Sequence, residues 1–411
     1  NPDYLRAERF PFPPSPWHPR YPGPEGLEPR SAPAHRPVAV HRMNPIQPSA
    51  LHSLPKVDLH RHLEGSLRLE TLADIARENG IDLPSYTIDD LRPFATIAGD
   101  EPDFQRFLTK FQFLRRFYPT REAVERVAYE AVQDAADGNV KYLELRFNPV
   151  ALARAQGFPL ASVTGWVCDA VARAQQERDI IVNLIVQIGR DEDLTTASEL
   201  AELAAAYQDR GIVGLDLAGD EEQYPAGPFA AIFRAARDRG LHVTVHAGEA
   251  GGPENVEEAV ERLGAERVGH GVRSVEDARV VQLLRKRGVT LEVCPTSNIQ
   301  TGVVGRVWDH PLPDLMAMGV PVSINTDDPS ISDTTLTDEY QIVISAMRLT
   351  MDDVKSSIVR AAEASFQPEE ERRRMAAWFQ SELFGNGKDE QKTTTKDTKS
   401  TKDTKCDRVS D

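Results

Sequence analysis

The chain has 411 residues, of which 40% are hydrophobic, and its formal net charge is −16 at pH 7. This length and apolar content are enough for a sizeable core in one or two domains. The acidic balance argues against nucleic acid and anionic membranes as partners, because both require a basic face, and no apolar run is long enough to span a membrane.

Both ends of the chain differ in composition from the middle. Residues 1–50 contain thirteen prolines, a density that excludes helices and central strands and predicts a disordered arm. Met43 lies within this arm and is a candidate natural start. Residues 385–411 form a low-complexity Lys/Thr/Asp tail, which we also expect to be disordered.

Between these ends, short apolar runs alternate with longer stretches of helical period. The runs span residues 56–62, 140–147, 180–188, 212–219, 242–249, 267–272, 290–298 and 321–329. Continuously apolar strands that alternate with helices indicate a parallel sheet covered by helices. Eight such units predict a single-domain (β/α)8 TIM barrel over residues 51–384, with an insertion at about 65–138 between the first two strands. A doubly wound open sheet is the alternative, because periodicity alone does not show closure.

Unusual polar residues follow the predicted strands, at the barrel end where catalysis takes place. They are His60, His62, Gly219, Asp220, His246, Glu249, His270, Asp327 and Asp328. Each motif alone also fits an ordinary surface pair, turn or helix cap. Their occurrence together at strand ends favours a functional site.

The first of these motifs, KVDLHRHLEG, carries two histidines at i and i+2. In a strand this spacing places His60 and His62 on one face, where both imidazoles can bind a divalent metal. His246 and Asp327 would complete the ligand set. Three histidines and a carboxylate suit zinc, although iron, cobalt and manganese accept the same ligand types.

A bound metal activates water, so the site also needs an acid and a base. Glu249 and His270 are the free candidates, and we expect a raised pKa for Glu249. The fourth run ends DLAGDE, without the lysine that bridges two metals in many barrel hydrolases. The pattern therefore predicts hydrolysis at a single metal. The alternatives are a two-metal amide or ester hydrolase and a non-catalytic binding or signalling protein built on the same barrel.

The motifs KVDLHRHLEG, DLAGDE, TVHAGE, VGHGV, CPTSN and SINTDDP occur in this order between about residues 54 and 384. In this order and spacing they resemble the adenosine deaminase family. The resemblance implies one zinc ion per chain, held by His60, His62, His246 and Asp327, and a small-molecule purine nucleoside as substrate. It further implies that His270 orients the attacking water and helps to deprotonate it, a task that Asp327 shares. Glu249 would protonate N1 as water adds to C6, with Asp328 at N7 and the Gly219 N–H at N3.

One position departs from many adenosine deaminases, which have aspartate where this chain has Glu64. The aspartate reaches the ribose, so Glu64 leaves open another 6-aminopurine substrate: adenine, an N6-modified adenosine or AMP, or aminodeoxyfutalosine. CPTSNIQT favours the nucleoside branch.

Two further features are interpreted from residue type and spacing. The four apolar residues Phe104, Phe107, Leu108 and Phe111 have helical spacing. They resemble the family's apolar gate over the purine, or form an ordinary core-facing helix. Cys294 is expected to be a buried apolar residue rather than a ligand. Three widely spaced cysteines, Cys168, Cys294 and Cys406, argue against disulfides and for the cytoplasm.

Overall fold

Eight parallel strands form one sheet in which each strand pairs with the next along the chain, in the order β1 to β8. The computed structural model describes residues 48–385. The strands are β1 (Lys56–His62), β2 (Val140–Phe147), β3 (Ile181–Gly189), β4 (Ile212–Ala218), β5 (His242–Ala247), β6 (Arg267–His270), β7 (Thr290–Val293) and β8 (Val322–Ile324). Met43, Cys406 and almost all of the predicted arm and tail lie outside the described residues.

The first and last strands meet at a short seam that closes the barrel. The Asp327 N–H donates to the His60 carbonyl at 2.8 Å, and the His62 N–H donates to the Asp327 carbonyl at 2.9 Å. These bonds flank a parallel bridge between Arg61 and Asp327. The open-sheet alternative is therefore wrong, and the predicted (β/α)8 barrel is confirmed.

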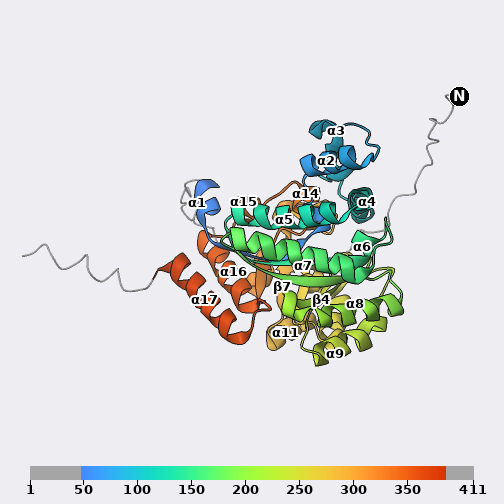
Figure 1. Ribbon diagram of the computed structural model, residues 1–411. Helices are drawn as coiled ribbons and strands as arrows, with labels where there is room; N and C mark the ends of the chain where they lie inside the picture. Colours follow the sequence, from blue (N-terminus) through green and yellow to red (C-terminus); the bar gives the residue numbers. More distant parts are fainter. Residues whose placement is uncertain (1–47, 386–411) are drawn as a thin grey trace, which may run out of the picture. The chain divides into compact units, whose positions relative to one another are not determined.

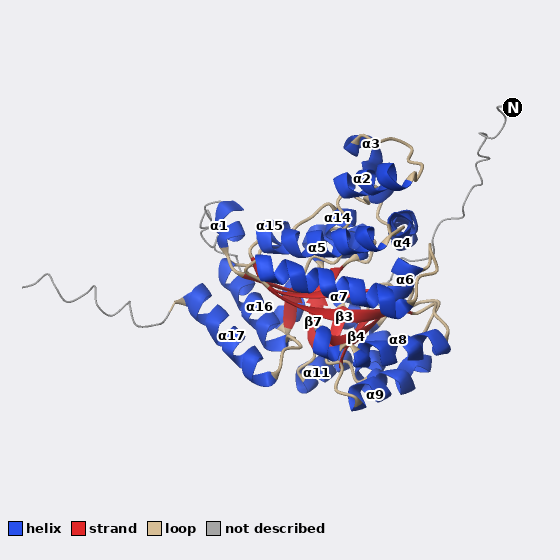
Figure 2. Cartoon of the chain, in the orientation of Figure 1, coloured by secondary structure: helices blue, strands red, loops and turns tan. Residues whose placement is uncertain are grey.

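Helices cover the outside of the strands (Figures 1 and 2). Those that precede β5 are α1 (Pro48–Ser53), α2 (Leu69–Asn79), α3 (Ile88–Ala95), α4 (Phe104–Leu114), α5 (Arg121–Asp137), α6 (Pro149–Ala153), α7 (Leu160–Glu177), α8 (Leu194–Ala206) and α9 (Ala230–Asp238). Those that follow it are α10 (Pro253–Glu258), α11 (Ala278–Arg287), α12 (Pro295–Gln300), α13 (Leu312–Ala317), α14 (Pro329–Ser332), α15 (Leu336–Ser345), α16 (Met351–Ala364) and α17 (Glu369–Phe384).

The long connection between β1 and β2 holds four helices. Its last helix, α5, packs against α7 and β2 and so belongs to the barrel's outer layer. The Thr120 hydroxyl accepts the Ala123 N–H and caps the start of α5. Helices α2 and α3 stand apart from this layer (Figure 1), and α4 brings the apolar segment from Phe104 to Leu114 to the mouth of the barrel.

The last two strands are shorter than the sequence predicted. β7 ends at Val293 and β8 at Ile324, whereas the predicted runs continued to residues 298 and 329. Pro295 and Pro329 each begin a short helix. Proline has no N–H to donate to a sheet but suits the first turn of a helix. Pro295 therefore accounts for the end of β7. β8 ends five residues before Pro329, and Asp327 pairs with Arg61 of β1 before the helix begins.

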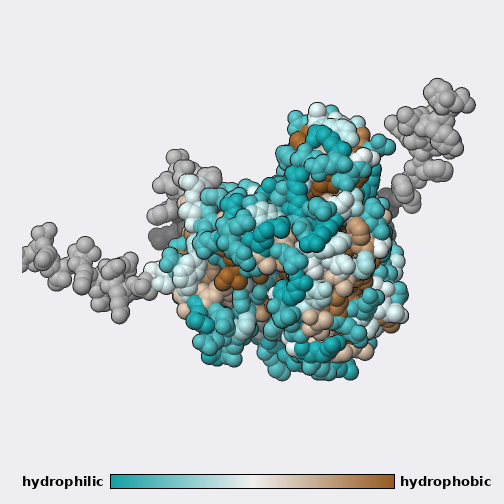
Figure 3. Space-filling view, viewed as in Figure 1, coloured by the Kyte–Doolittle hydropathy of each residue, from teal (hydrophilic) through white to brown (hydrophobic). Residues whose placement is uncertain are grey.

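The apolar core lies between the strands and the surrounding helices, while the barrel interior is unusually polar. Glu144, Arg146, Asp216, Arg267 and Glu292 project from strands and are buried. Buried charges of this kind require partners, and these partners connect the fold to the site. The face of the molecule in Figure 3 is mostly hydrophilic.

Candidate functional site

Three imidazoles and one carboxylate converge at the carboxyl ends of β1, β5 and β8. The Nε2 atom of His62 lies 3.3 Å from that of His60 and 3.2 Å from that of His246. The Asp327 Oδ1 atom lies 3.1 Å from the His60 Nε2 and 3.2 Å from the His62 Nε2. All four side chains are buried. The structure thus brings together the four residues predicted as metal ligands.

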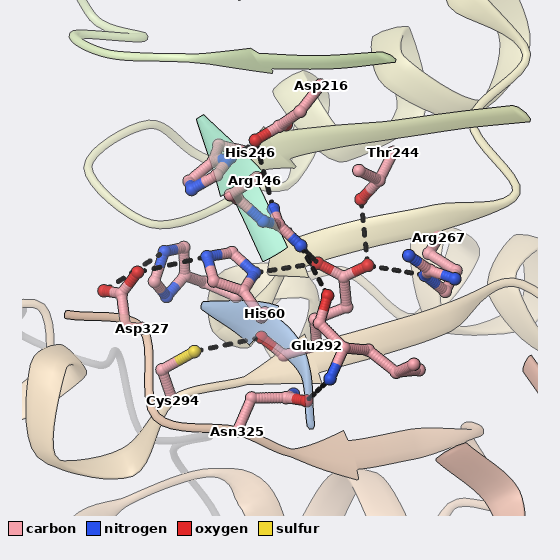
Figure 4. Close-up of polar contacts among 12 residues, drawn as sticks. His60, Arg146, Asp216, Thr244, His246, Arg267, Glu292, Cys294, Asn325 and Asp327 are labelled. Atoms are coloured by element: carbon pink, nitrogen blue, oxygen red, sulfur yellow. Dashed lines mark hydrogen bonds and ion pairs between the residues drawn. The ribbon is translucent and has the colours of Figure 1, made fainter. Parts of the chain in front are cut away.

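The outer nitrogen of each imidazole faces a hydrogen-bond acceptor, so each ring donates from Nδ1 (Figure 4 shows two of the rings and their partners). The Nδ1 pairs are His60 with Glu292 at 2.7 Å, His62 with Gln187 at 2.8 Å, and His246 with Asp216 at 3.0 Å. A neutral ring that donates from Nδ1 presents only a lone pair at Nε2. Three lone pairs and a carboxylate oxygen facing one point repel one another unless a cation lies between them. The donor set therefore fits a divalent metal.

A buried ionic network connects two of these acceptors. Arg146 donates from Nη1 to Asp216 at 3.0 Å and from Nη2 to Glu292 at 2.8 Å, and Arg267 donates from Nε to Glu292 at 2.6 Å. Burial alone raises the pKa of Glu292, but the charges of Arg146 and Arg267 outweigh it and hold that pKa well below its usual range. Glu292 therefore stays ionised and keeps His60 in the tautomer that a metal requires.

The two predicted acid–base residues face the imidazole cluster. The His270 Nε2 lies 3.5 Å from the Glu249 Oε2 and 4.0 Å from the Asp327 Oδ2. Burial, together with the negative charges of Asp327 and Glu221, raises the pKa of Glu249 well above its usual range. Burial lowers the pKa of His270 well below its usual range. A protonated glutamic acid thus lies beside a neutral histidine.

Two site residues hold an unusual backbone conformation. His270 has a φ of 58° and Asp327 a φ of 64°, both in the left-handed region that non-glycine residues rarely adopt. Such strain persists where the surrounding structure enforces it, often at functional sites. Here the seam with β1 fixes Asp327.

A chain of hydrogen bonds orients the His270 ring. The Leu312 N–H donates to the His310 Nδ1 at 3.1 Å, so the His310 Nε2–H donates to the Asn298 Oδ1 at 3.3 Å. The Asn298 amide then donates to the His270 Nδ1 at 3.1 Å. Burial lowers the pKa of His310 to about 3, so it stays neutral. His270 therefore accepts at Nδ1 and directs an Nε2–H toward Glu249 and Asp327.

A cavity lies above the cluster and is bounded on one side by α4. Its lining includes the four apolar α4 residues that the sequence identified, Phe104, Phe107, Leu108 and Phe111. Gly219, which directly follows β4, also lines it. Phe107 also packs in the apolar core. The α4 segment therefore both lines the cavity and packs inward, while Cys294 is fully buried as expected.

Two acids line the cavity with one unpartnered oxygen each. Glu64 accepts the Asn148 N–H through Oε1 at 2.8 Å, but its buried Oε2 has no partner, and neither has the Asp328 Oδ1. A Cβ on Gly65 would lie 1.8 Å from the Asp328 Oδ1, so glycine at residue 65 makes room for this carboxyl group. Buried acceptors without partners are costly, and a ligand in the cavity could satisfy them.

Sequence reasoning missed the residues that hold the site histidines. Gln187, Asp216 and Glu292 hold the three predicted ligand histidines, and Asn298 holds His270. Three of these four partners are polar residues inside otherwise apolar strands (β3, β4 and β7), which was a usable signal. Which nitrogen each of them contacts depends on the arrangement of strands around the barrel.

Known proteins with similar sequences and folds give the family. The family model described as adenosine deaminase matches residues 55–380. The adenosine deaminase of Klebsiella pneumoniae (strain 342) is 39% identical over 321 residues, which are 78% of this chain and 96% of that protein. The chain belongs to the adenosine deaminase family. This member is therefore a hydrolase that acts on a C–N bond of a cyclic amidine.

Two solved structures share the fold of this family member. The adenine deaminase of Arthrobacter aurescens has a TM-score of 0.74 at 28% identity, covering 80% of this chain and 99% of that one. A zinc-bound amidohydrolase of Burkholderia ambifaria has a TM-score of 0.76 at 25% identity, and the match covers 84% of this chain and 94% of that one. Family membership and the zinc-bound structure imply a divalent metal, and the His/Asp cluster can bind one. Among the described residues, no helix has the length and apolar character needed to cross a bilayer.

Proposed function

We propose that this chain is a zinc-dependent adenosine deaminase, which converts adenosine and 2′-deoxyadenosine to inosine and 2′-deoxyinosine and releases ammonia. The juxtaposition of Glu249 and His270 with the imidazole cluster in one cavity carries the proposal. The 39% identity to the adenosine deaminase of Klebsiella pneumoniae supports the choice of substrate.

His60, His62, His246 and Asp327 would hold a single zinc ion, since their Nε2 and Oδ1 atoms face one point. When bound, the ion supplies a water with a lowered pKa as nucleophile. In the proposed reaction His270 would orient this water with its Nε2–H, and Asp327 would accept the water's proton through Oδ2. A neutral His270 that carries its proton on Nε2 cannot take a second proton there, so the base role that the resemblance divides between the two residues is assigned to Asp327. These roles agree with the hydrogen bond from Asn298, which makes the His270 Nδ1 an acceptor.

The purine is recognised at its three ring acceptors. Glu249 donates its proton to N1, which makes C6 more electrophilic, and the ring loses its aromaticity as water adds there. The Gly219 N–H contacts N3. Asp328 contacts N7, and because N7 is an acceptor this contact requires the acid form of Asp328. The α4 residues cover the ring, and Glu64 lies toward the sugar.

Free adenine is the second candidate substrate, and Glu64 is the observation that favours it. The adenine deaminase of Arthrobacter aurescens, at 28% identity, shows that the fold hosts this activity. Turnover of adenosine, deoxyadenosine and adenine by the purified chain, followed by ammonia release and loss of the 6-aminopurine chromophore, decides between them. Turnover of adenine without turnover of adenosine would reject the proposal.

Metal analysis tests the single-ion site. We expect about one zinc per chain, as at other catalytic zinc sites that leave a position open for water. Two ions per chain would favour the two-metal hydrolase. Bound metal without ammonia release from any purine would favour a non-catalytic nucleoside-binding protein.

A further inference from the structure

One buried carboxylate holds the loop that carries Glu249. Glu221 lies in the turn after β4 and is 5% exposed. Its Oε1 accepts the N–H groups of Glu249 and Gly251, both at 2.7 Å. Its Oε2 accepts the Gly248 N–H and the Asn255 side-chain amide, both at 3.0 Å. A carboxylate that accepts three loop N–H groups within four residues, and one side-chain amide, fixes the path of that loop.

The loop sequence leaves space for this carboxylate. Gly248 has a φ of 68°, which favours glycine. A Cβ on Gly251 would lie 2.9 Å from the Glu221 Cδ and 2.0 Å from the Asn255 Nδ2. The repeated glycines of HAGEAGG therefore allow the backbone to wrap closely around Glu221.

The loop is also held from its opposite side, by Arg273. The Arg273 Nη1 donates to the Ala250 carbonyl at 2.9 Å, and its backbone N–H donates to the Gly248 carbonyl at 3.0 Å. Arg190, at the end of β3, donates to the carbonyls of His246 and Tyr224, both at 2.8 Å, and so joins the Glu221 turn to β5. Glu221 is the group in this arrangement that binds the amide of Glu249 itself.

We propose that Glu221 is a positioning residue that aims the Glu249 carboxyl group at the substrate. The proposal rests on the proposed function, in which Glu249 gives a proton to a ring nitrogen. Proton transfer requires the donor within hydrogen-bond distance of its acceptor. A displacement of about 1 Å can lower the rate about a hundredfold. Glu221 is not part of the cavity lining and contacts none of the predicted metal ligands. It reaches the site through the Glu249 backbone N–H and through its negative charge, which raises the pKa of Glu249. The variant Gly251→Ala keeps this charge and so separates the two effects.

The first test is Glu221→Gln. Gln is nearly isosteric, but its NH2 group faces two of the donors that the carboxylate satisfied, so the loop has to shift. We expect kcat to fall about 10- to 100-fold. KM should change less than about threefold, because the cavity walls stay in place. The zinc content per chain should equal that of the wild type.

Gly251→Ala is an independent variant that keeps Glu221 but pushes it away from the loop. It should give the same fall in kcat with the same zinc content. If Glu221→Gln fails to fold, Gly251→Ala alone tests whether Glu221 positions Glu249. Glu266→Gln is the matched control. Glu266 accepts the Val243 N–H at 3.3 Å at the start of β5, at the end of this strand remote from the site. We expect its kcat to stay within about twofold of the wild type.

The possible outcomes separate this inference from the proposed function. An inactive wild type with bound zinc would reject the proposed function. An active wild type whose folded, zinc-loaded Glu221→Gln and Gly251→Ala variants keep kcat within about twofold would overturn the inference. Loss of zinc in Glu221→Gln, or a rise in KM that equals the fall in kcat/KM, would also overturn it.

Discussion

Arg146 and Glu292 meet in the barrel interior, with the Arg146 Nη2 2.8 Å from the Glu292 Oε2, and the same carboxylate oxygen accepts the His60 Nδ1–H at 2.7 Å. Arg146 also contacts Asp216, which holds His246. One guanidinium thus balances the charges behind two of the proposed ligands. Partners of this kind typically change metal affinity by 10- to 100-fold.

We therefore expect Arg146→Met to weaken zinc binding by about 10- to 100-fold. Breaking a buried pair costs roughly 3–5 kcal/mol of unfolding free energy, so the measurement needs a folded sample. Competition with a chelator gives the zinc affinity, and circular dichroism reports folding. Arg68→Met, which removes a partly exposed ion pair to Asp134, is the control. Equal zinc affinity in both variants would contradict the assigned role of Arg146.

Glu249→Gln should keep zinc and fold but lose about 10²- to 10⁴-fold in kcat, because Gln cannot give a proton to N1. Purine turnover and metal content are measured on the same preparation. His246→Ala is the comparison, since it should lose the metal itself. Retention of wild-type turnover by Glu249→Gln would remove Glu249 from the mechanism.

Asn298→Asp tests the orientation of the His270 ring. An ionised aspartate only accepts hydrogen bonds, so it would favour the neutral His270 tautomer that carries its proton on Nδ1. The His270 Nε2 would then have no proton to donate. Loss of one oriented donor typically costs about 10²- to 10³-fold in kcat. The position of the ring proton is measured by nitrogen NMR of labelled histidine. An unchanged tautomer accompanied by wild-type kcat would show that Asn298 does not set it.

Glu339 predicts a pH dependence of stability outside the candidate site. Burial raises its pKa to about 7, although the Thr296 N–H and Thr334 hydroxyl donate to it. Because this pKa lies above the ordinary 4.5, the folded state binds more protons than the unfolded state. The contribution of Glu339 is therefore complete below about pH 4.5 and is lost as the pH rises through 7, an effect of about 3 kcal/mol.

The Glu339→Gln variant lacks this titration. Its unfolding free energy, measured with denaturant and expressed relative to the wild type, should rise between about pH 5 and pH 8. Taking the difference between the two unfolding free energies cancels the titration of the groups that both proteins share. A difference that is flat across this range would show that Glu339 is not protonated at low pH in the folded state.

The sequence predicted the strands well because a parallel barrel buries both faces of each strand, so β3 and β4 appear as nearly continuous apolar runs. Because His60 and His246 both lie at carboxyl ends of predicted parallel strands, the sequence alone predicts that they lie near one another. The hydrogen-bond partners could not be predicted in the same way. Glu292 lies far from His60 in the sequence, and their contact follows from how side chains from separate strands point into the barrel. The early end of β7 depended on Pro295, whose effect the apolar pattern concealed.

The seam between β1 and Asp327 has a consequence for the order in which the molecule matures. His60 and His62, the proposed ligands on β1, are synthesised long before Asp327, the proposed carboxylate ligand that follows β8. A nascent polypeptide that stops before β8 lacks both its closing neighbour and the fourth ligand. Under the proposed ligand set, a metal ion would bind fully only after the ring of strands is complete, and it would then join β1 to the segment that follows β8.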